Sequence, residues 1–261
     1  MIKPTGLAYD KTTRTLFIAD PDADAIFAAH LGIGDRHESH SSDDDAHVNI
    51  SSASSSYSLS SSSATAPSLN VTAYTTVLQR DSMLSNPFRI ALHISGHLMV
   101  TTFDKHAVYF VLLGCDHSAP QKPCTCRVSF MGLNFPGGSC VFPIGIENKA
   151  GFNDGPAGGT QFSFPVGMAV GPDGTVYVAD SGNNAIRVIA LLHGTSADGM
   201  DPVSFWKSLS SARVTTLVGG PGVVIEESRL RSPHDVAIGP DGTSVYVADT
   251  KWVLVGLQRG E

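Results

Sequence analysis

The chain has 261 residues and a formal net charge of −7, and this length is ample for one all-β domain with a single hydrophobic core. The acidic charge disfavours a protein that binds by neutralising phosphates, and no stripe of basic and aromatic residues is present, so nucleic acid is not expected as a partner. The longest apolar segment, residues 107–113, is too short to cross a bilayer, so no membrane span is expected here.

Four stretches of the chain share one pattern, and each begins at a proline. They start near residues 4, 87, 165 and 233. In each, a short apolar strand leads through a turn to a strand rich in β-branched and aromatic residues, and a second turn leads to a third strand. The copy from 87 is degenerate, whereas the copies from 165 and 233 share the turn Gly-Pro-Asp-Gly and the strand Val-Tyr-Val-Ala-Asp. We therefore predict that residues 1–261 form one repeat domain.

The copy from 165 has the clearest strands. Residues 167–170, 175–179 and 185–191 are predicted to be antiparallel strands joined by tight turns. Three such strands cannot bury both faces alone, so they need neighbours of the same kind. Candidate fourth strands follow three of the repeats, at residues 75–77, 141–144 and 215–217. Four strands per repeat describe an all-β fold, a β-propeller of four-stranded blades.

The number of blades is a separate question from the type of blade. Four repeats are visible, and the residues after the third strand of the last repeat offer no fourth strand. An unpaired edge strand favours aggregation, so we expect this chain to be part of a larger propeller of about six blades. The alternative is a four-bladed disc whose closure is frayed.

The repeat resembles that of the NHL-repeat propellers, within the superfamily of six-bladed propellers that includes SMP-30 and gluconolactonase. The family motif is matched by Pro165, Gly167, Asp180, Asn183 and Ile186, and the segment Gly-Phe-Asn-Asp-Gly at 151–155 resembles the one that often precedes such a blade. The resemblance covers most of the chain outside its inserts and implies the fold. It does not imply one function, because similar propellers serve as interaction scaffolds, RNA-binding modules, lactonases and an amidating lyase.

A serine-rich insert at residues 31–70 separates the third and fourth strands of the first repeat. Residues 51–63 are almost all serine, so we expect the insert to be disordered, because it lacks apolar surface to offset the entropy cost of ordering. Asn49 and Asn70 begin formal N-glycosylation sequons. Such sequons also arise by chance in chains rich in serine and threonine.

A second insert, at residues 114–139, gathers the cysteines. Cys115, Cys124, Cys126 and Cys140 are the only cysteines of the chain. One residue between Cys124 and Cys126 is too few for the usual zinc spacing, so disulfides within the second repeat are expected rather than a metal site. Free thiols are the alternative. If the cysteines form disulfides and the sequons are glycosylated, the protein is secreted or lumenal. Otherwise it is cytoplasmic.

A third insert, at residues 192–212, contains Asp201 followed by Pro202, which predicts one short helix. All three inserts lie between a third and a fourth strand, so they are expected on one face of the disc. By analogy with the family, ligand sites are expected on the opposite face, around the mouth of the central channel.

Three aspartates recur at one point of the repeat, after the second strand. Because Asp20, Asp180 and Asp249 each precede a turn, we expect them to cap it by accepting backbone N–H bonds. This structural role explains them without a catalytic function.

The two positions after each leading proline begin the innermost strand and are expected at the mouth of the channel. Glycine is the usual residue at the second of them, but Arg89 and Asp235 stand there in two repeats, and His234 precedes Asp235. These three side chains are the candidate ligand-binding residues, for an anion, a metal or a polar ligand. A structural ion pair between Arg89 and Asp235 is the alternative.

The sequence thus favours a binding or interaction scaffold, more readily than an enzyme, with a protein or a small polar ligand as partner. The alternative is a lactonase-like or amidating-lyase-like enzyme that needs Ca²⁺ or Zn²⁺ in the channel, although no metal site or cofactor is identified from the residues. Catalytic residues are not assigned, since no pairing of histidines on one element stands out among the ten present. Metal content measured by mass spectrometry would separate the two interpretations.

Overall fold

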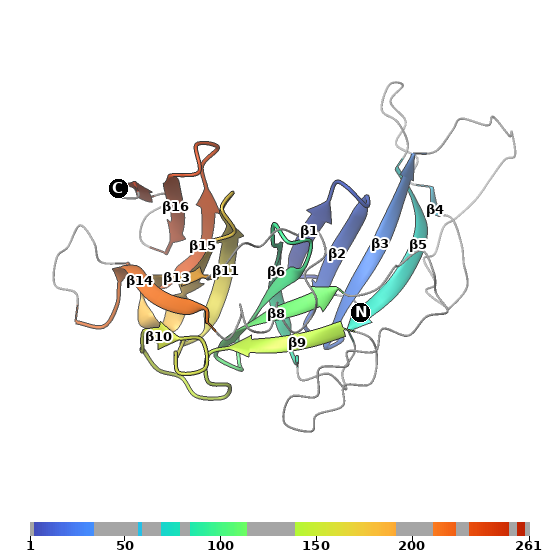
Figure 1. Ribbon diagram of the computed structural model, residues 1–261. Coiled ribbons are helices and arrows are strands. Elements are labelled where there is room, and N and C mark those ends of the chain that lie inside the picture. The colour runs from blue at the N-terminus through green and yellow to red at the C-terminus, as the bar shows by residue number, and fades with distance from the viewer. Residues whose placement is uncertain are drawn as a thin grey trace, which may run out of the picture.

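The computed structural model describes residues 3–33, 57–58, 69–78, 84–113, 139–191, 211–222, 230–250 and 255–258. Apart from one 3-10 turn, η1 (Ser181–Asn183), the elements in these residues are β-strands, paired into four antiparallel sheets. The prediction of an all-β fold of propeller blades is confirmed. Figure 1 shows the sheets side by side in an arc, with the N-terminal sheet in blue at one end and the C-terminal sheet in red at the other. We number them blade 1 to blade 4.

Blades 1 and 2 each run outward in chain order, from a first strand near the inside of the arc to a fourth strand at its outside. Blade 1 carries a two-residue fifth strand beyond the fourth. The strands of blade 1 are β1 (Gly6–Asp10), β2 (Thr15–Asp20), β3 (Ala25–Ile33), β5 (Leu69–Leu78) and the outermost β4 (Tyr57–Ser58), and those of blade 2 are β6 (Pro87–Leu92), β7 (Leu98–Thr102), β8 (Ala107–Leu113) and β9 (Ser139–Ile144).

Blades 3 and 4 repeat the order. In blade 3 the connection from blade 2 adds a short outermost strand, and the described part of blade 4 has three strands. The strands of blade 3 are β11 (Pro165–Val170), β12 (Val176–Asp180), β13 (Ala185–Ala190), β14 (Arg213–Gly219) and β10 (Gly155–Pro156), and those of blade 4 are β15 (Pro233–Ile238), β16 (Ser244–Asp249) and β17 (Val255–Gln258).

The fourth strands are longer than their sequence patterns indicated. The candidate at 75–77 is the end of a strand of ten residues, β5, which pairs with the nine-residue β3. Backbone pairing with a long third strand extends it, which a short apolar pattern does not reveal. As a consequence β3 continues to Ile33, so the insert of blade 1 begins later than residue 31 and part of it returns as β4.

Several predictions fall outside the described residues. These are Asn49, the cysteines Cys115, Cys124 and Cys126, and the helix expected near Asp201. The backbones of two other predicted residues are described: Asn70 pairs with Gly32 in blade 1, and Cys140 pairs with Leu112 in blade 2. Glycosylation and disulfide formation therefore stay predictions.

Each pair of neighbouring blades buries one apolar core between two sheet faces. We call the face toward the next blade the A face and the face toward the preceding blade the B face. Because successive side chains of a strand point to opposite faces, each strand serves both cores. Phe17 on the A face of blade 1 shares a core with Ile90 and Val100 on the B face of blade 2. The equivalent partners between later blades are Met99 with Val178, and Tyr177 with Val247.

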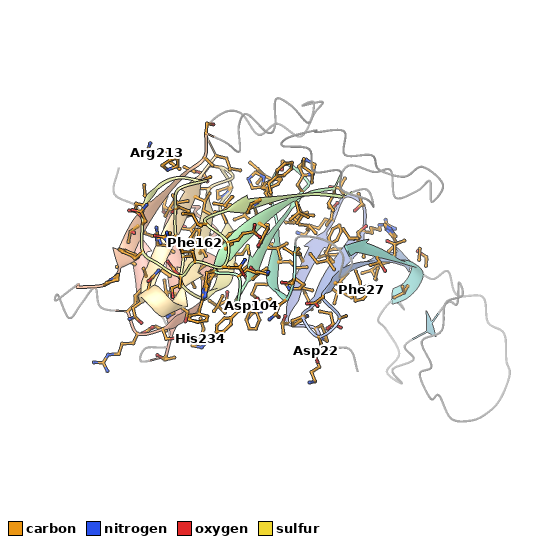
Figure 2. All side chains as sticks on the ribbon, turned by 90° about the horizontal axis from the view of Figure 1, so that it is seen from below. Asp22, Phe27, Asp104, Phe162, Arg213 and His234 are labelled. Atoms are coloured by element: carbon orange, nitrogen blue, oxygen red, sulfur yellow. The ribbon has the colours of Figure 1, made fainter. Side chains whose placement is uncertain are left out.

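Because neighbouring strands are antiparallel, the connections between them lie alternately at the two ends of each sheet. These two ends form two further faces of the arc, distinct from the A and B faces. The start of each first strand lies at the same end of its sheet as the turn between the second and third strands, and we call this the turn face. Figure 2 shows Asp22, Asp104 and His234, all from such segments, along one edge, with Arg213 from the end of an insert at the opposite edge. The turns between the second and third strands thus share one face with the starts of the first strands, and the side of the disc on which the inserts lie stays a prediction.

Candidate ligand-binding face

Glycine at the start of a first strand lets the next blade approach. A Cβ atom on Gly6 would lie 2.9 Å from the Arg89 Cα, and one on Gly167 would lie 2.4 Å from the Asp235 Cα. Real Cβ atoms do not come so close to backbone, so both positions require glycine. Arg89 of blade 2 thus lies opposite Gly6 of blade 1, and Asp235 of blade 4 lies opposite Gly167 of blade 3. Glycine and a charged residue therefore alternate from blade to blade at this position.

Arg89 and Asp235 form an ion pair on the turn face. The Arg89 Nη2 lies 3.4 Å from an Asp235 carboxylate oxygen, and Nη1 donates to the Thr5 carbonyl oxygen at 3.2 Å. Arg89, in the first strand of blade 2, therefore contacts the residue just before the first strand of blade 1 and a residue of the first strand of blade 4. The two side chains are 40% and 45% exposed, so water and a ligand can reach both charges.

His234 does not join this pair through any contact among the described residues. Its Nδ1 lies 2.7 Å from the carbonyl oxygen of Ser232, and the residue is exposed. Because a carbonyl oxygen only accepts, Nδ1 carries a proton in this contact. Of the three predicted channel-mouth groups, two are brought together and the third is held by its own chain segment.

A row of aromatic side chains lies next to Arg89 on the same face, and sequence analysis did not find it. We call Phe88, Phe103, Phe164 and His106 the aromatic row. Its ring centroids are 6.0 Å apart for Phe88 and Phe103, 4.7 Å for Phe103 and Phe164, and 4.4 Å for Phe164 and His106. Phe103 is 39% exposed and Phe164 is 38% exposed. The row presents apolar surface on the turn face of blades 2 and 3.

The backbone of Phe164 is in the left-handed region, with φ of 49°. The equivalent residues before the leading prolines of blades 2 and 4 are Asn86 and Ser232, also left-handed. Asparagine tolerates this conformation, whereas a bulky phenylalanine is uncommon in it. The sequence did contain an indication of the aromatic row. The residue before the leading proline is a phenylalanine in blade 3, whereas the other repeats have Lys3, Asn86 and Ser232 there.

The recurring aspartates reach further than their own turns. The Asp20 Oδ1 accepts the Ala23 N–H at 3.1 Å, within its own turn. In blades 3 and 4 the donor is instead the residue two positions before the leading proline. The Ser163 N–H donates to the Asp180 Oδ1 at 2.7 Å, and the Arg231 N–H donates to the Asp249 Oδ1 at 2.8 Å. These buried carboxylates fasten the entry into the first strand to the end of the second, a contact between segments that local sequence does not reveal.

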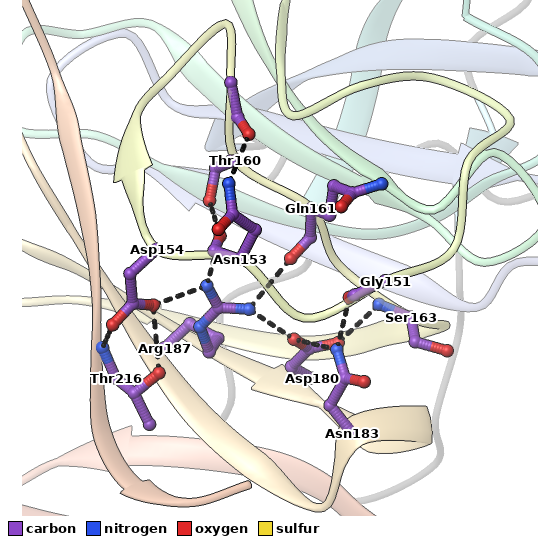
Figure 3. Close-up of polar contacts among 11 residues, drawn as sticks. Gly151, Asn153, Asp154, Thr160, Gln161, Ser163, Asp180, Asn183, Arg187 and Thr216 are labelled. Carbon is purple, nitrogen blue, oxygen red and sulfur yellow. Dashed lines mark hydrogen bonds and ion pairs between the residues drawn. The ribbon is translucent and has the colours of Figure 1, made fainter. Parts of the chain in front are cut away.

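Asp180 also belongs to a buried network around Arg187 (Figure 3). The guanidinium, which is fully buried, donates to the Asp180 Oδ2 at 2.8 Å and to the Asp154 Oδ1 at 2.7 Å. It also donates to the carbonyl oxygens of Gln161 and Asn153, each at 2.9 Å. Burial raises the pKa of Asp180, while hydrogen bonds from Asn183 and Ser163 and the charge of Arg187 oppose this shift.

The Arg187 network has a structural role. The Phe152 and Phe162 rings lie 4.8 and 5.2 Å from the guanidinium carbon, at cation–π distance. The Gly-Phe-Asn-Asp-Gly segment, noted in the sequence as typical of the family, thus wraps a buried cation of β13. The carboxylates and both Nη groups of Arg187 are occupied by one another, and only the buried Nε of this arginine has no hydrogen-bond partner among the described residues. The turn face is therefore the candidate site.

Within the ranges that the structure describes, no three side chains of His, Cys, Asp or Glu gather as ligands for a metal ion. In the same ranges there is no helix long and apolar enough to span a membrane.

Comparison with known proteins identifies the repeat. The model of the NHL repeat matches residues 162–189, which contain the start of blade 3 and Asp180. A stretch of 58 residues is 44% identical to Protein SUPPRESSOR OF QUENCHING 1, chloroplastic, from Arabidopsis thaliana, and covers 22% of this chain and 6% of that protein.

Two solved structures share the fold. A protein of unknown function from Bacteroides thetaiotaomicron VPI-5482 aligns with a TM-score of 0.54 and 14% identity over 97% of this chain and 46% of its own. An auxiliary nutrient binding protein from Bacteroides ovatus ATCC 8483 aligns with a TM-score of 0.53 and 14% identity over 94% and 45%. The chain spans less than half the length of these structures, and identity this low is evidence for the fold alone. The chain therefore contains an NHL repeat at 162–189 within a β-propeller fold of four sheets with one topology.

Proposed function

We propose that this chain is a binding module and that the aromatic row on its turn face binds a protein partner. The observation that carries the proposal is the exposure of Phe103 and Phe164 in a contiguous row of rings. Isolated exposed apolar residues are ordinary, whereas a contiguous patch is typical of an interaction site.

The composition of this surface supports a protein partner. Aromatic residues and arginine are enriched at the centres of protein interfaces, where they contribute most of the binding free energy. Phe88 and Arg89 are consecutive residues of β6, so the aromatic row and the Arg89–Asp235 pair both lie near the start of this strand, at the turn face. A partner that covers the rings would also contact a half-exposed cation and a half-exposed carboxylate, which can fix its orientation.

The conformation of Phe164 supports the same conclusion. A left-handed non-glycine residue costs on the order of 1–3 kcal/mol, and such strain gathers at functional sites. Asn86 is also left-handed at the same position in blade 2, but asparagine adopts this conformation more readily than phenylalanine, so a phenylalanine at 164 is best explained by what its ring contacts.

The proposal is tested by comparing what three immobilised proteins retain from an extract of the source cells. The variant carries Phe103→Ser and Phe164→Asn, the second change taken from the residue at this position in blade 2. The matched control is Leu217→Ser, which removes a side chain that is 36% exposed on β14. We expect a protein retained by the wild type and the control and lost with the variant, whose melting temperature should stay unchanged. If all three proteins retain the same set, or the wild type retains none, the proposal is wrong.

A further inference from the structure

One hydrogen bond recurs at each junction between two described blades, on the turn face. Its acceptor is the side chain of the residue just before a third strand, and its donor is the backbone N–H of the residue before the leading proline of the next blade. We call it the junction hydrogen bond. The donors and acceptors are Asn86 and the Asp24 Oδ1 at 2.8 Å, Phe164 and the His106 Nδ1 at 3.1 Å, and Ser232 and the Asn184 Oδ1 at 2.8 Å.

Both residues of every junction hydrogen bond have a left-handed backbone, with φ between 49° and 56°. Residues other than glycine adopt this conformation only where their surroundings hold them in it. The bond fastens the donor to the turn of the preceding blade, at the point where the chain enters the next first strand. We infer that it is one of the contacts that hold the donor in its left-handed conformation.

The acceptor at the junction of blades 2 and 3 differs in its chemistry from the other two. Carboxylate and amide oxygens, as in Asp24 and Asn184, keep a lone pair for an N–H donor at neutral pH and in mild acid. An imidazole nitrogen accepts a hydrogen bond only while it carries no proton. The contact from Phe164 therefore requires a neutral His106 whose proton is on Nε2. Of the three junction hydrogen bonds, this one is sensitive to a proton.

His106 contacts the ring of Phe164 as well as its backbone. The two ring centroids are 4.4 Å apart at an angle of 77°, so the rings meet edge to face. Phe164 in turn lies against Phe103, with the centroids 4.7 Å apart. The position of the exposed Phe164 ring, and with it the middle of the aromatic row, thus depends on the state of His106.

Several charged groups lie on the segments around His106. They are Asp104 and Lys105 in its own turn, Glu147 and Lys149 in the connection that follows blade 2, and Asp180 at the end of β12 in blade 3. Glu147 accepts the hydroxyl of Tyr109, and Asp180 accepts the Ser163 N–H. Among the described residues, none of these groups forms a hydrogen bond or an ion pair with the His106 ring, which is bonded to Phe164.

We propose that His106 is a positioning residue for the aromatic row, and that a proton on its ring in mild acid frees Phe164 and releases the bound partner. A proton on Nδ1 converts the acceptor into a second donor that faces the Phe164 N–H, so the junction hydrogen bond is lost. Histidine is the side chain that changes its charge between about pH 5 and 8. The regulation acts on the aromatic row and so rests on the proposed function.

The first test uses the free protein labelled with nitrogen-15. Long-range proton–nitrogen NMR spectra at about pH 7.5 should show Nδ1 of His106 without a proton. Between about pH 7.5 and 5.5 the protection of the Phe164 amide from hydrogen exchange, corrected for the intrinsic rate, should fall at least about tenfold. The amides of Asn86 and Ser232 serve as internal controls and should change less than about twofold. A protonated Nδ1 at neutral pH, or equal changes at all three amides, would overturn the proposal.

The matched variant is His106→Asn, which places the acceptor of blade 3 at the junction of blades 2 and 3. Its amide oxygen accepts at both pH values, so the protection of the Phe164 amide should no longer depend on pH. If this variant does not fold, His106→Asp, which takes the acceptor of blade 1, replaces it. A loss of protection in mild acid that persists in the folded variant would show that another group is responsible, and the proposal would be wrong.

The second test repeats the retention experiment with immobilised protein at the two pH values. Because His106→Asn also removes one ring of the row, the readout is the ratio of partner retained at about pH 7.5 to that at about pH 5.5. This ratio should be at least about tenfold for the wild type and close to one for the variant. Equal ratios would overturn the regulation. If neither protein retains a partner at either pH, the proposed function fails, and the exchange measurement alone decides whether His106 positions Phe164.

Discussion

Gly167 of blade 3 lies directly under Asp235 of blade 4, so that a Cβ atom at position 167 would stand 2.4 Å from both the Cα and the Oδ1 of Asp235. The missing side chain allows two blades to meet and leaves room for Asp235 to reach Arg89. One glycine therefore supports both the packing of the blades and the charge pair at the turn face.

Gly167→Ala is expected to destabilise the protein by about 1–3 kcal/mol, because the added methyl group meets backbone that cannot move without opening the blade junction. Gly158→Ala is the control, since a Cβ there meets nothing within 4 Å, and its effect should be neutral or slightly stabilising. Urea unfolding monitored by circular dichroism gives both values. Equal effects of the two changes would contradict the close approach.

Arg187→Met is expected to cost about 3–5 kcal/mol, because it leaves the buried carboxylate of Asp180 without its cation. Arg213→Met, which changes an exposed arginine of the same blade, should stay within about 0.5 kcal/mol. Chemical denaturation at pH 7 compares them. A loss below about 1 kcal/mol for Arg187→Met would mean that the network does not hold blade 3 together.

The half-exposed pair of Arg89 and Asp235 should contribute little to stability. We expect a double-mutant cycle with Arg89→Met and Asp235→Asn to give a coupling free energy of about 0–1 kcal/mol, decreasing with added salt. Thermal unfolding at two salt concentrations measures it. A coupling above about 2 kcal/mol would assign these residues to structure alone and remove them from the binding face.

Stability should fall in mild acid because of two histidines at the junction of blades 2 and 3. His93 is buried, with its Nε2 3.0 Å from the Gly174 carbonyl oxygen and its Nδ1 2.8 Å from the Ser95 hydroxyl. Burial lowers the pKa of His93, and burial together with the charge of His93 lowers the pKa of His97 to about 4. An unfolded histidine has a pKa near 6.5, so the unfolded chain binds protons that the folded chain does not.

The contribution of His97 is therefore fully present above pH 6.5 and is lost as the pH falls toward about 4. It amounts to something on the order of 3 kcal/mol. His97→Gln should flatten this part of the profile of unfolding free energy against pH. A wild-type profile that is flat between pH 6.5 and 4 would refute the expectation.

The blade pattern could be predicted from the sequence because it is local. Alternation of side chains and turn residues such as Pro172, Asp173 and Gly174 specify each hairpin within about twenty residues. The recurrence of the pattern then required neighbours of the same kind. The four repeats, their order of strands and the position of Arg89 and Asp235 at the start of the first strands all followed from this.

Contacts between distant segments were decided by the tertiary structure alone. The aromatic row joins Phe88, Phe103 and Phe164 from three separate stretches, and Asp180 accepts its N–H bond from Ser163 rather than from its own turn. Identical residues also have different environments, since Tyr177 is buried and Tyr246 is exposed. A repeated sequence determines which faces a blade presents, but the packing of one sheet on the next determines which of those faces are covered.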